Sequence, residues 1–294
     1  MKLIKGAPIA DIVYQECQTE IDQLKKAGHT PGLAVILVGD DPASKAYVGS
    51  KDKKCKELGL HSVKIEKSAD LSQAELLELI DELNADQAIH GILVQMPLPK
   101  HLDEDEVILR ISPEKDVDGL HPTNMGKLAM EDPTGFAPCT PSGCQKMLIE
   151  SGIDTEGKHV VIVGRSLLVG KTLALLMMAK GQGANSTVTV AHSRTKNLPQ
   201  LTKQADILVA AIGRPLFIGT EHVKDGAVII DVGINRIEDK TRKSGSRLVG
   251  DVDFNAVAES CEAITPVPGG VGKMTIAMLM HNTIRACRLA NSSK

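Results

Sequence analysis

The chain has little aromatic character, with no Trp, two Tyr and three Phe among its 294 residues. Proteins that bind single-stranded nucleic acid without sequence preference stack bases on aromatic side chains and follow the phosphates with a basic groove. A formal net charge of −3 supplies no excess of basic residues for such a groove. We therefore expect no nucleic acid partner.

Long apolar runs and paired cysteines are also missing. The first residues contain no apolar segment of the kind found in secretory signals, and apolar runs such as ILVAAI are far too short to span a bilayer. None of the six cysteines forms a C-x-x-C pair, and the nine histidines show no H-x-x-x-H spacing. These absences favour a cytoplasmic protein with reduced thiols, no membrane association and no metal site.

The composition is that of an ordinary globular protein, and the length favours two domains. In the first half, buried parallel strands are predicted at 32–39, 61–67 and 88–95. Asp41 followed by Pro42 predicts the start of a helix that ends near Leu58, because an N-cap residue and a proline in the first helical turn are both favoured there. Ser72 and Glu75 form a capping-box pattern that opens a helix over 73–86, and another helix is expected around 103–111.

The second half shows the same alternation. Thr140 and Pro141 are interpreted as the N-cap and first residue of a helix over 142–152. Four short β-rich runs follow, at 158–164, 186–192, 205–213 and 226–233, and a long apolar helix is expected over 274–290. This alternation predicts a right-handed parallel sheet covered by helices.

The stretch VIVGRSLLVGKT (161–172) joins a predicted strand to a predicted helix. A phosphate loop of the Walker type has four residues between its glycines, whereas five separate Gly164 from Gly170. The stretch is thus interpreted as a dinucleotide-binding loop, with a simple turn and an NTPase loop as alternatives. The NTPase alternative uses Asp231 as a magnesium ligand.

The end of the next strand helps to choose the nucleotide. An NAD site usually has an Asp or Glu there to bind the ribose hydroxyls. Here the strand is followed by His192, Ser193, Arg194 and Thr195, and Arg165 lies in the preceding loop. Cations at both positions suit a 2′-phosphate, so NADP is predicted over NAD.

In the first predicted helix, Tyr47 and Lys51 lie one turn apart, on one face with Ser44 and Cys55. A lysine flanked by Lys53 and Lys54 is expected to have a lowered pKa, which suits proton transfer. The alternative is a solvated charged face without catalytic function. The spacing of Tyr47 and Lys51 also occurs in short-chain dehydrogenases, but their glycine-rich loop precedes the tyrosine, so that assignment fails.

Six motifs in order, covering nearly the whole chain, resemble the bifunctional methylenetetrahydrofolate dehydrogenase/methenyltetrahydrofolate cyclohydrolase family. They are DDPASKAYVGSKDKKCKELG, GILVQMPLP, PEKDVDGLHPTNMGKL, PCTPSG, VIVGRSLLVGK and TPVPGGVGKMTIAMLM. The resemblance implies two α/β domains flanking a cleft. The catalytic, folate-binding domain would comprise 1–138 with the C-terminal helix 270–294 returning to it, and the NADP-binding Rossmann domain would comprise 139–269.

The resemblance implies an oxidoreductase and hydrolase of one-carbon metabolism. In one shared cleft the enzyme would oxidise methylenetetrahydrofolate with NADP and hydrolyse the methenyl product to formyltetrahydrofolate, serving tetrahydrofolate interconversion and purine biosynthesis. A cytoplasmic homodimer of the short form, without a formyltetrahydrofolate synthetase module, is expected. Lys51 would carry the acid/base work, Gln95 would tune its charge, Tyr47 would stack on the folate, and Asp118 would bind the pterin edge.

The same resemblance assigns further residues. The substrate-binding residues would be Ser44, Tyr47, Gln95, Asp118, Pro266, Gly269 and Gly270. The cofactor-binding residues would be Gly164, Arg165, Ser166, Gly170, His192, Ser193, Arg194, Thr195, Gly213 and Ile234. Two departures stand out, since Thr172 and Lys273 occupy positions where the family usually has proline. The competing hypotheses are a dehydrogenase acting on another substrate, a folate dehydrogenase without the hydrolase step, and a non-catalytic dinucleotide sensor.

Overall fold

The structure, a computed structural model, describes residues 1–242 and 245–292. The chain divides into two compact units. One comprises Ile12–Cys139 with Ile276–Lys294 and is called the three-strand unit; the other comprises Met1–Asp11 with Thr140–Thr275 and is called the six-strand unit. Both contain a parallel sheet with helices, which confirms the predicted α/β class. No helix in the described ranges has the length and apolar character needed to cross a membrane.

The three-strand unit has the strand order β3-β2-β4. These strands are β2 (Gly32–Val38), β3 (His61–Lys67) and β4 (Gly91–Val94), close to the predicted positions. Every residue of β2 is buried, as its uninterrupted apolar run predicts. Its helices are α2 (Pro42–Leu58), α3 (Gln73–Ala85), α4 (Glu104–Arg110) and α5 (Pro122–Ala129). The core under α3 and α4 is built from one face of β2 and the apolar stripe of α3.

Local capping explains where these helices begin. The Asp41 side chain accepts a hydrogen bond from the Ser44 backbone N–H at 2.7 Å, and Pro42 is the first residue of α2. Ser72 and Glu75 form the predicted capping box at the start of α3. α2 ends at Gly59, which adopts the left-handed conformation (φ 72°) that glycine tolerates best. The sequence signals at these three positions are confirmed.

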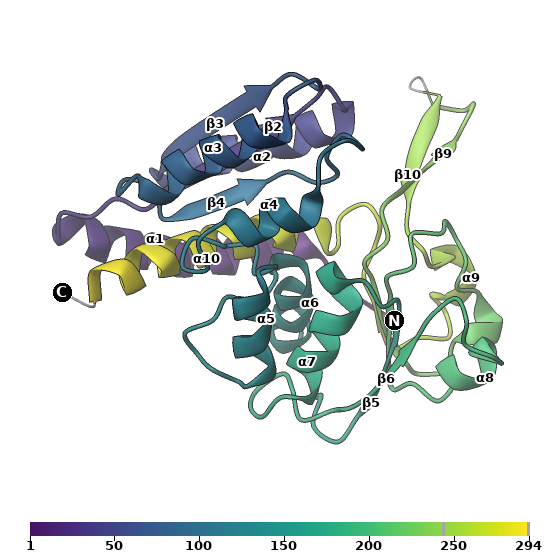
Figure 1. Cartoon of the computed structure of the whole chain (residues 1–294). Helices are drawn as coiled ribbons and strands as arrows, with labels where there is room; N and C mark the ends of the chain where they lie inside the picture. Colours follow the sequence, from purple (N-terminus) through teal and green to yellow (C-terminus); the bar gives the residue numbers. More distant parts are fainter. Residues whose placement is uncertain (243–244, 293–294) are drawn as a thin grey trace. The chain divides into compact units, whose positions relative to one another are not determined.

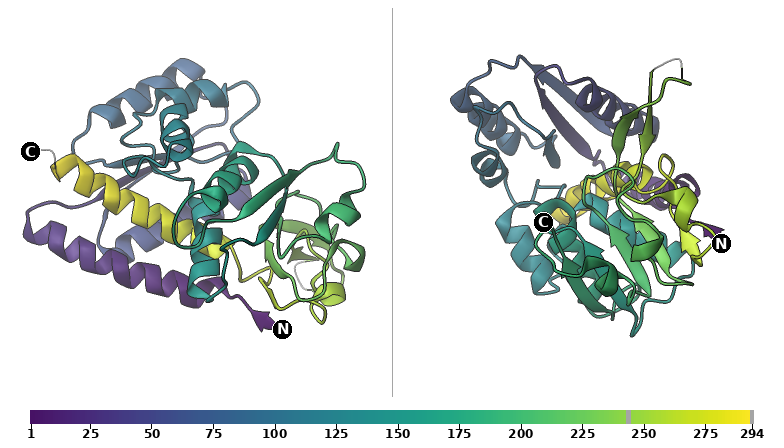
Figure 2. Two further views of the ribbon diagram at one scale, coloured as in Figure 1. Left: turned by 90° about the horizontal axis from the view of Figure 1, so that it is seen from below. Right: turned by 90° about the vertical axis from the view of Figure 1, so that its right-hand side faces the viewer.

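Two long helices also contribute to the three-strand unit. α1 (Gly6–Lys26) and α10 (Gly272–Ser292) run side by side there (Figures 1 and 2), and Arg288 of α10 lies 3.9 Å from the Glu20 carboxylate of α1. The Asn282 side chain of α10 donates hydrogen bonds to the carbonyls of Val117 (2.9 Å) and Ala137 (3.1 Å). These contacts fasten α10 to the loop that carries Asp118.

The six-strand unit has the order β1-β11-β8-β7-β5-β6, with every pair parallel. The four predicted strands are β5 (His159–Val163), β6 (Thr187–Ala191), β7 (Ile207–Ala210) and β8 (Val228–Asp231). The chain passes from β5 to β6 on one side and returns to β7 on the other, so the strand order reverses at β5. In open α/β sheets, ligands bind at the carboxyl ends of the strands where this reversal occurs.

Several elements of the six-strand unit were not predicted. They are β1 (Lys2–Leu3), β11 (Ala263–Ile264) and the hairpin of β9 (Asn235–Glu238) and β10 (Ser246–Val249), which extends away from the sheet (Figure 1). Its short helical segments are α7 (Thr172–Met178), α8 (Leu198–Thr202), η2 (Thr220–His222) and α9 (Phe254–Val257).

One predicted helix start is wrong. α6 spans Cys139–Glu150, so Thr140 lies inside the helix and not at its N-cap. The Thr140 hydroxyl instead lies 3.0 Å from the Thr275 hydroxyl. Pro141 remains in the first turn, where its missing N–H has no helical partner to lose. The Thr-Pro pair therefore predicted the first turn of the helix correctly, but not the residue at which the helix begins.

Candidate active site

A buried lysine marks the candidate site of the three-strand unit. Ser44, Val48, Lys51 and Cys55 form the buried face of α2, and Lys51 is only 6% exposed. Its Nζ donates a hydrogen bond to Oε1 of Gln95 at 2.9 Å. The Gln95 Nε2 donates to the Met96 carbonyl at 2.7 Å, which turns the amide oxygen toward the lysine. The predicted pairing of Lys51 with Gln95 thus exists as a direct contact.

The sheet brings Asp118 to the same edge. The chain at Asp116 pairs in parallel with Ile92, so residues that follow Asp116 run beside the end of β4, where Gln95 lies. Asp116 is buried and accepts hydrogen bonds from the His121 N–H (2.7 Å) and from Nδ2 of Asn124 (2.9 Å), which fixes this loop. Asp118 is close enough to Lys51 to affect its ionisation.

Burial lowers the pKa of Lys51, while the nearby Asp118 and Cys139 act in the opposite direction. The direction agrees with the sequence-based expectation, but the expected cause is wrong. Lys53 and Lys54 both pair with Glu57, at 3.8 Å and 2.5 Å, and neither contributes to the lowering. Desolvation therefore replaces neighbouring positive charge as the reason for the lowered pKa of Lys51.

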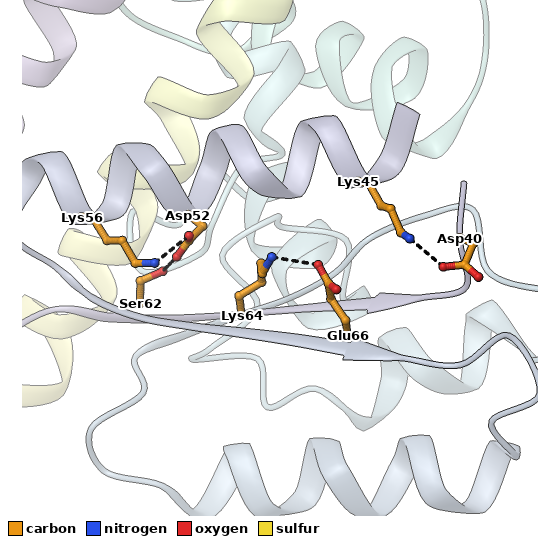
Figure 3. Close-up of polar contacts among 7 residues, drawn as sticks. All are labelled: Asp40, Lys45, Asp52, Lys56, Ser62, Lys64 and Glu66. Atoms are coloured by element: carbon orange, nitrogen blue, oxygen red, sulfur yellow. Dashed lines mark hydrogen bonds and ion pairs between the residues drawn. The ribbon is translucent and has the colours of Figure 1, made fainter. Parts of the chain in front are cut away.

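Other charged side chains of α2 and β3 form ion pairs along these two elements (Figure 3). Lys45 pairs with Asp40 at 2.7 Å, and Lys64 pairs with Glu66 at 2.8 Å. Asp52 accepts hydrogen bonds from Lys56 and from the Ser62 hydroxyl, each at 2.8 Å. These lysines belong to a charged surface, as the alternative interpretation predicted. Lys51 differs from them because it is buried.

Tyr47 lies one helical turn before Lys51 and is 40% exposed, which leaves much of its ring accessible.

Two residues near the site were not predicted from the sequence. Cys139 is completely buried next to Asp118, and its thiol donates to the Val117 carbonyl at 3.4 Å. Asn282 lies in the apolar sequence of α10. A single amide side chain among apolar residues is the only sequence feature that could have indicated it, because buried amides need hydrogen-bond partners.

The loop after β5 explains the unusual glycine spacing. Residues Leu167–Lys171 form a π-helical turn, in which the Lys171 N–H donates to the Ser166 carbonyl five residues earlier at 3.0 Å. A π-turn accommodates one more residue than an α-turn, and such turns are frequent at functional sites. Ser166 caps the turn by accepting from the Val169 N–H at 3.2 Å. The π-turn therefore accommodates the fifth residue between the two glycines, which the Walker spacing lacks.

Both glycines of this loop are required by close backbone contacts. A Cβ on Gly170 would lie 2.1 Å from the Gly164 carbonyl oxygen, and a Cβ on Gly164 would lie 2.2 Å from the Ala211 carbonyl oxygen. Gly164 also has φ 144°, and its N–H donates to the Ala191 carbonyl at 2.9 Å. The glycines therefore pack together the ends of β5, β6 and β7.

The predicted cofactor residues lie at the carboxyl ends of β5 to β8. In the tight turn after β6, the His192 N–H donates to the Thr195 hydroxyl at 2.9 Å, and the Arg194 N–H donates to Nδ1 of His192 at 3.1 Å. Arg165 and Arg194 are exposed on adjacent strand ends, and neither forms an ion pair with the described residues. Gly213 and Ile234 follow β7 and β8 and are also exposed. Two free cations at this edge fit an additional phosphate.

The loop after β11 holds Pro266, Gly269 and Gly270. The structure places these three in the six-strand unit, and the other predicted substrate residues in the three-strand unit. The Gly269 carbonyl accepts from the Gly6 N–H at 2.8 Å, and a Cβ on Gly270 would lie 2.7 Å from the Pro266 carbonyl oxygen. Lys273 follows as an exposed residue near the start of α10.

Asp231, the magnesium ligand of the NTPase alternative, is 3% exposed at the end of β8. Its carboxylate accepts three backbone hydrogen bonds at 3.0 Å each, from Gly233, Asp251 and Val252. The oxygens of Asp231 are thus already used within the fold, which removes support for a magnesium site. Burial, with a smaller effect of Asp251, raises the pKa of Asp231 to about 6 against the lowering by these hydrogen bonds.

This raised pKa predicts a measurable pH dependence. Because the folded pKa lies above the ordinary value of 3.8, the native state gains stability as the pH falls through about 6. Relative to Asp231→Asn, the wild-type free energy of unfolding should increase by about 1 kcal/mol between about pH 7.5 and about pH 5. Urea denaturation of both proteins at the two pH values measures this difference. A difference that is constant or shrinks toward acid pH would contradict the shift.

Two family models match this chain, one over each of two consecutive parts. Residues 4–118 match the family described as tetrahydrofolate dehydrogenase/cyclohydrolase, catalytic domain. Residues 138–291 match the NAD(P)-binding domain of the same family. The chain is 56% identical over 288 residues to the bifunctional protein FolD of Prosthecochloris aestuarii, which covers 97% of this chain and 98% of that protein.

Two solved structures extend the comparison. The bifunctional enzyme FolD, a methylenetetrahydrofolate dehydrogenase/cyclohydrolase from Campylobacter jejuni, superposes with a TM-score of 0.92 at 44% identity, over 99% of both chains. The FolD of Trypanosoma brucei, complexed with NADP and an inhibitor, has a TM-score of 0.91 at 36% identity, over 98% of this chain and 97% of that one. The resemblance, the enzyme class and the nicotinamide cofactor indicated by the sequence are confirmed. The chain belongs to the tetrahydrofolate dehydrogenase/cyclohydrolase family and contains both its catalytic and its NAD(P)-binding domain.

Proposed function

We propose that this protein oxidises methylenetetrahydrofolate with NADP and hydrolyses the methenyltetrahydrofolate formed to formyltetrahydrofolate. The observation that carries the proposal is the buried Lys51, hydrogen-bonded to Gln95 beside Asp118 in the catalytic domain. Membership of the family and the NADP bound to the Trypanosoma brucei relative support the choice of substrate and cofactor.

Lys51 acts as the acid/base group of the hydrolysis. The methenyl bridge is a cationic carbon, and the water that attacks it must lose a proton as the new C–O bond forms. One C–N bond of this adduct then breaks as its nitrogen takes up a proton and the hydroxyl loses one, which leaves the formyl group. A neutral amine can accept that proton, and burial favours the neutral form of Lys51. A neutral lysine also avoids repelling the cationic substrate. Gln95 holds the amine in place through its carbonyl oxygen.

The other side chains bind and orient the folate. The exposed ring of Tyr47 offers a stacking surface one turn before Lys51. The carboxylate of Asp118 accepts hydrogen bonds from the amino-pyrimidine edge of the pterin, and Ser44 supports the site from the buried face of α2. Pro266, Gly269 and Gly270 complete the proposed substrate-binding set.

NADP, when bound, accepts the hydride of the first reaction. Arg165, Ser193 and Arg194 hold its 2′-phosphate, which distinguishes it from NAD. The remaining proposed contacts are the backbone and side chains of Gly164, Ser166, Gly170, His192, Thr195, Gly213 and Ile234. Their placement along the carboxyl ends of adjacent strands, with a helical turn opening after Gly164, supports this assignment.

The finer assignments are part of the same proposal. The domains are 1–138 with 270–294, and 139–269, a division that differs from the two compact units in the assignment of Met1–Asp11, Cys139 and 270–275. The contacts of Asn282 and Met280 with Val117 and Cys55 support counting the last helix with the first domain. A cytoplasmic location is supported by six cysteines that are all free and buried. The family resemblance supports a homodimer and the supply of formyl groups for purine biosynthesis.

A coupled assay tests the proposal. The purified chain is mixed with methylenetetrahydrofolate and either NADP or NAD, and reduced cofactor and the methenyl chromophore are followed together. We expect reduction of NADP in preference to NAD, and loss of added methenyltetrahydrofolate faster than its uncatalysed hydrolysis. Equal catalytic efficiency with NAD contradicts the role of Arg165 and Arg194. Methenyltetrahydrofolate that decays at the uncatalysed rate favours a simple dehydrogenase, and NADP binding without folate turnover favours a sensor.

A further inference from the structure

A completely buried carboxylate lies behind the proposed cofactor edge. Asp251, 0% exposed, follows β10 and accepts the backbone N–H groups of Ile212 (2.6 Å), Gly213 (2.9 Å) and Arg214 (2.9 Å). Its Oδ1 also accepts Nδ2 of Asn235 at 2.8 Å. Both oxygens of Asp251 therefore carry two hydrogen bonds each.

These bonds join two loops that leave adjacent strands. Ile212, Gly213 and Arg214 follow β7, whereas Asn235 begins β9 after the loop that leaves β8. Three successive N–H groups that converge on one point form an anion-binding nest. Here the nest is filled by the protein's own carboxylate, and charge-assisted hydrogen bonds of this kind are the stronger ones.

The surrounding chain is shaped to admit this side chain. The Asp251 N–H donates to Oδ1 of Asp231 at 3.0 Å, and its carbonyl accepts the Ile218 N–H at 2.9 Å. A Cβ on Gly233 would lie 2.4 Å from the Asp251 carboxyl carbon. Only a glycine at 233 leaves room for the carboxylate in this position. The backbone hydrogen bonds to Asp231 and Ile218 and the close approach of Gly233 thus fix the position of Asp251.

We propose that Asp251 is the positioning residue of the cofactor site, because it sets the relative placement of Gly213 and Ile234. It is buried and does not itself reach a ligand, whereas Gly213 and Ile234 are exposed at the strand ends. This inference rests on the proposed function, in which those two residues contact NADP. Loosening the two loops should weaken cofactor binding and leave the folate chemistry of Lys51 intact.

The test compares Asp251→Asn with Asp253→Asn in the full chain. Asparagine keeps the size of Asp251 but turns one acceptor oxygen into an NH₂ group that faces backbone N–H groups. We expect the KM for NADP in the dehydrogenase reaction to rise about tenfold to hundredfold. Hydrolysis of methenyltetrahydrofolate, which consumes no cofactor, should keep the wild-type rate. Asp253 undergoes the same change of charge but caps α9, through Ala256, and should alter neither activity.

A second variant separates positioning from general stability. Asn235→Ala removes only the bond between the two loops and leaves the three backbone bonds to Asp251. It should raise the KM for NADP less than Asp251→Asn does, and the double variant should match Asp251→Asn alone. An unchanged KM in Asp251→Asn, or in Asn235→Ala if the former does not fold, overturns the inference. A parallel fall of hydrolysis in Asp251→Asn also overturns it. A wild-type protein without NADP-dependent oxidation would instead refute the proposed function.

Discussion

Replacing Lys51 with Met is expected to lower the enzymatic hydrolysis of methenyltetrahydrofolate by about 10²–10⁴-fold, the usual contribution of a positioned acid/base group. Methionine has nearly the same length and apolar stem, so it should fill the buried position on α2. It cannot accept a proton from the attacking water. Because the substituted residue lies in the three-strand unit and the dinucleotide loops lie in the six-strand unit, NADP binding should remain.

The measurement follows loss of the methenyl chromophore, corrected for the uncatalysed rate, alongside a titration with NADP. Lys53→Met is the matched control, since the Lys53 side chain lies on the same helix, is 80% exposed and pairs only weakly with Glu57 at 3.8 Å. The control should hydrolyse at the wild-type rate. Hydrolysis retained in Lys51→Met would remove Lys51 from the mechanism, whatever the outcome with NADP.

Local signals in the sequence predicted the three strands and the helices α2, α3 and α4 of the three-strand unit, but not α1 or α5. The caps at Asp41 and Ser72 are local hydrogen-bonding patterns, and the apolar run of β2 reports burial on both faces of the sheet. β1 and β11 contain two residues each and pair only with each other and β8. Such short strands exist because of tertiary pairing and carry no periodicity to detect.

The candidate site also contains residues that local spacing predicts and residues that only the fold brings together. Tyr47 and Lys51 share a face by helical spacing, but their neighbours in KDKKCK are equally charged, and only the fold shows which lysine is buried. Cys139 and Asn282 reach the site from distant segments through hydrogen bonds to the loop at Val117. The hydrogen bonds of Asp251 likewise exist only because the loops after β7, β8 and β10 meet in the fold. Contacts of this kind follow from topology, which single-sequence patterns do not encode.

Gln95→Glu should produce the second large effect, a displacement of the pH profile of hydrolysis toward alkaline pH. The new carboxylate would lie where the Gln95 amide oxygen now accepts from Lys51 at 2.9 Å. An opposite charge within about 4–6 Å favours the ammonium form and shifts a pKa by about 1–3 units. The pKa of Lys51, lowered by burial in the wild type, should therefore rise. At neutral pH less neutral amine remains, so hydrolysis slows and recovers only at higher pH.

Gln95→Met serves as the control for this shift, because it removes the hydrogen-bond acceptor without adding a charge. A carbonyl acceptor stabilises the ammonium more than the amine, so its loss should leave the profile unmoved or displaced toward acid pH. The measurement is the rate of methenyltetrahydrofolate hydrolysis across the pH range, with the uncatalysed rate subtracted at each pH. Opposite displacements in the two variants would identify Lys51 as the titrating base. If both variants slow hydrolysis and leave the midpoint of the profile in place, Gln95 contacts substrate without controlling the ionisation of Lys51.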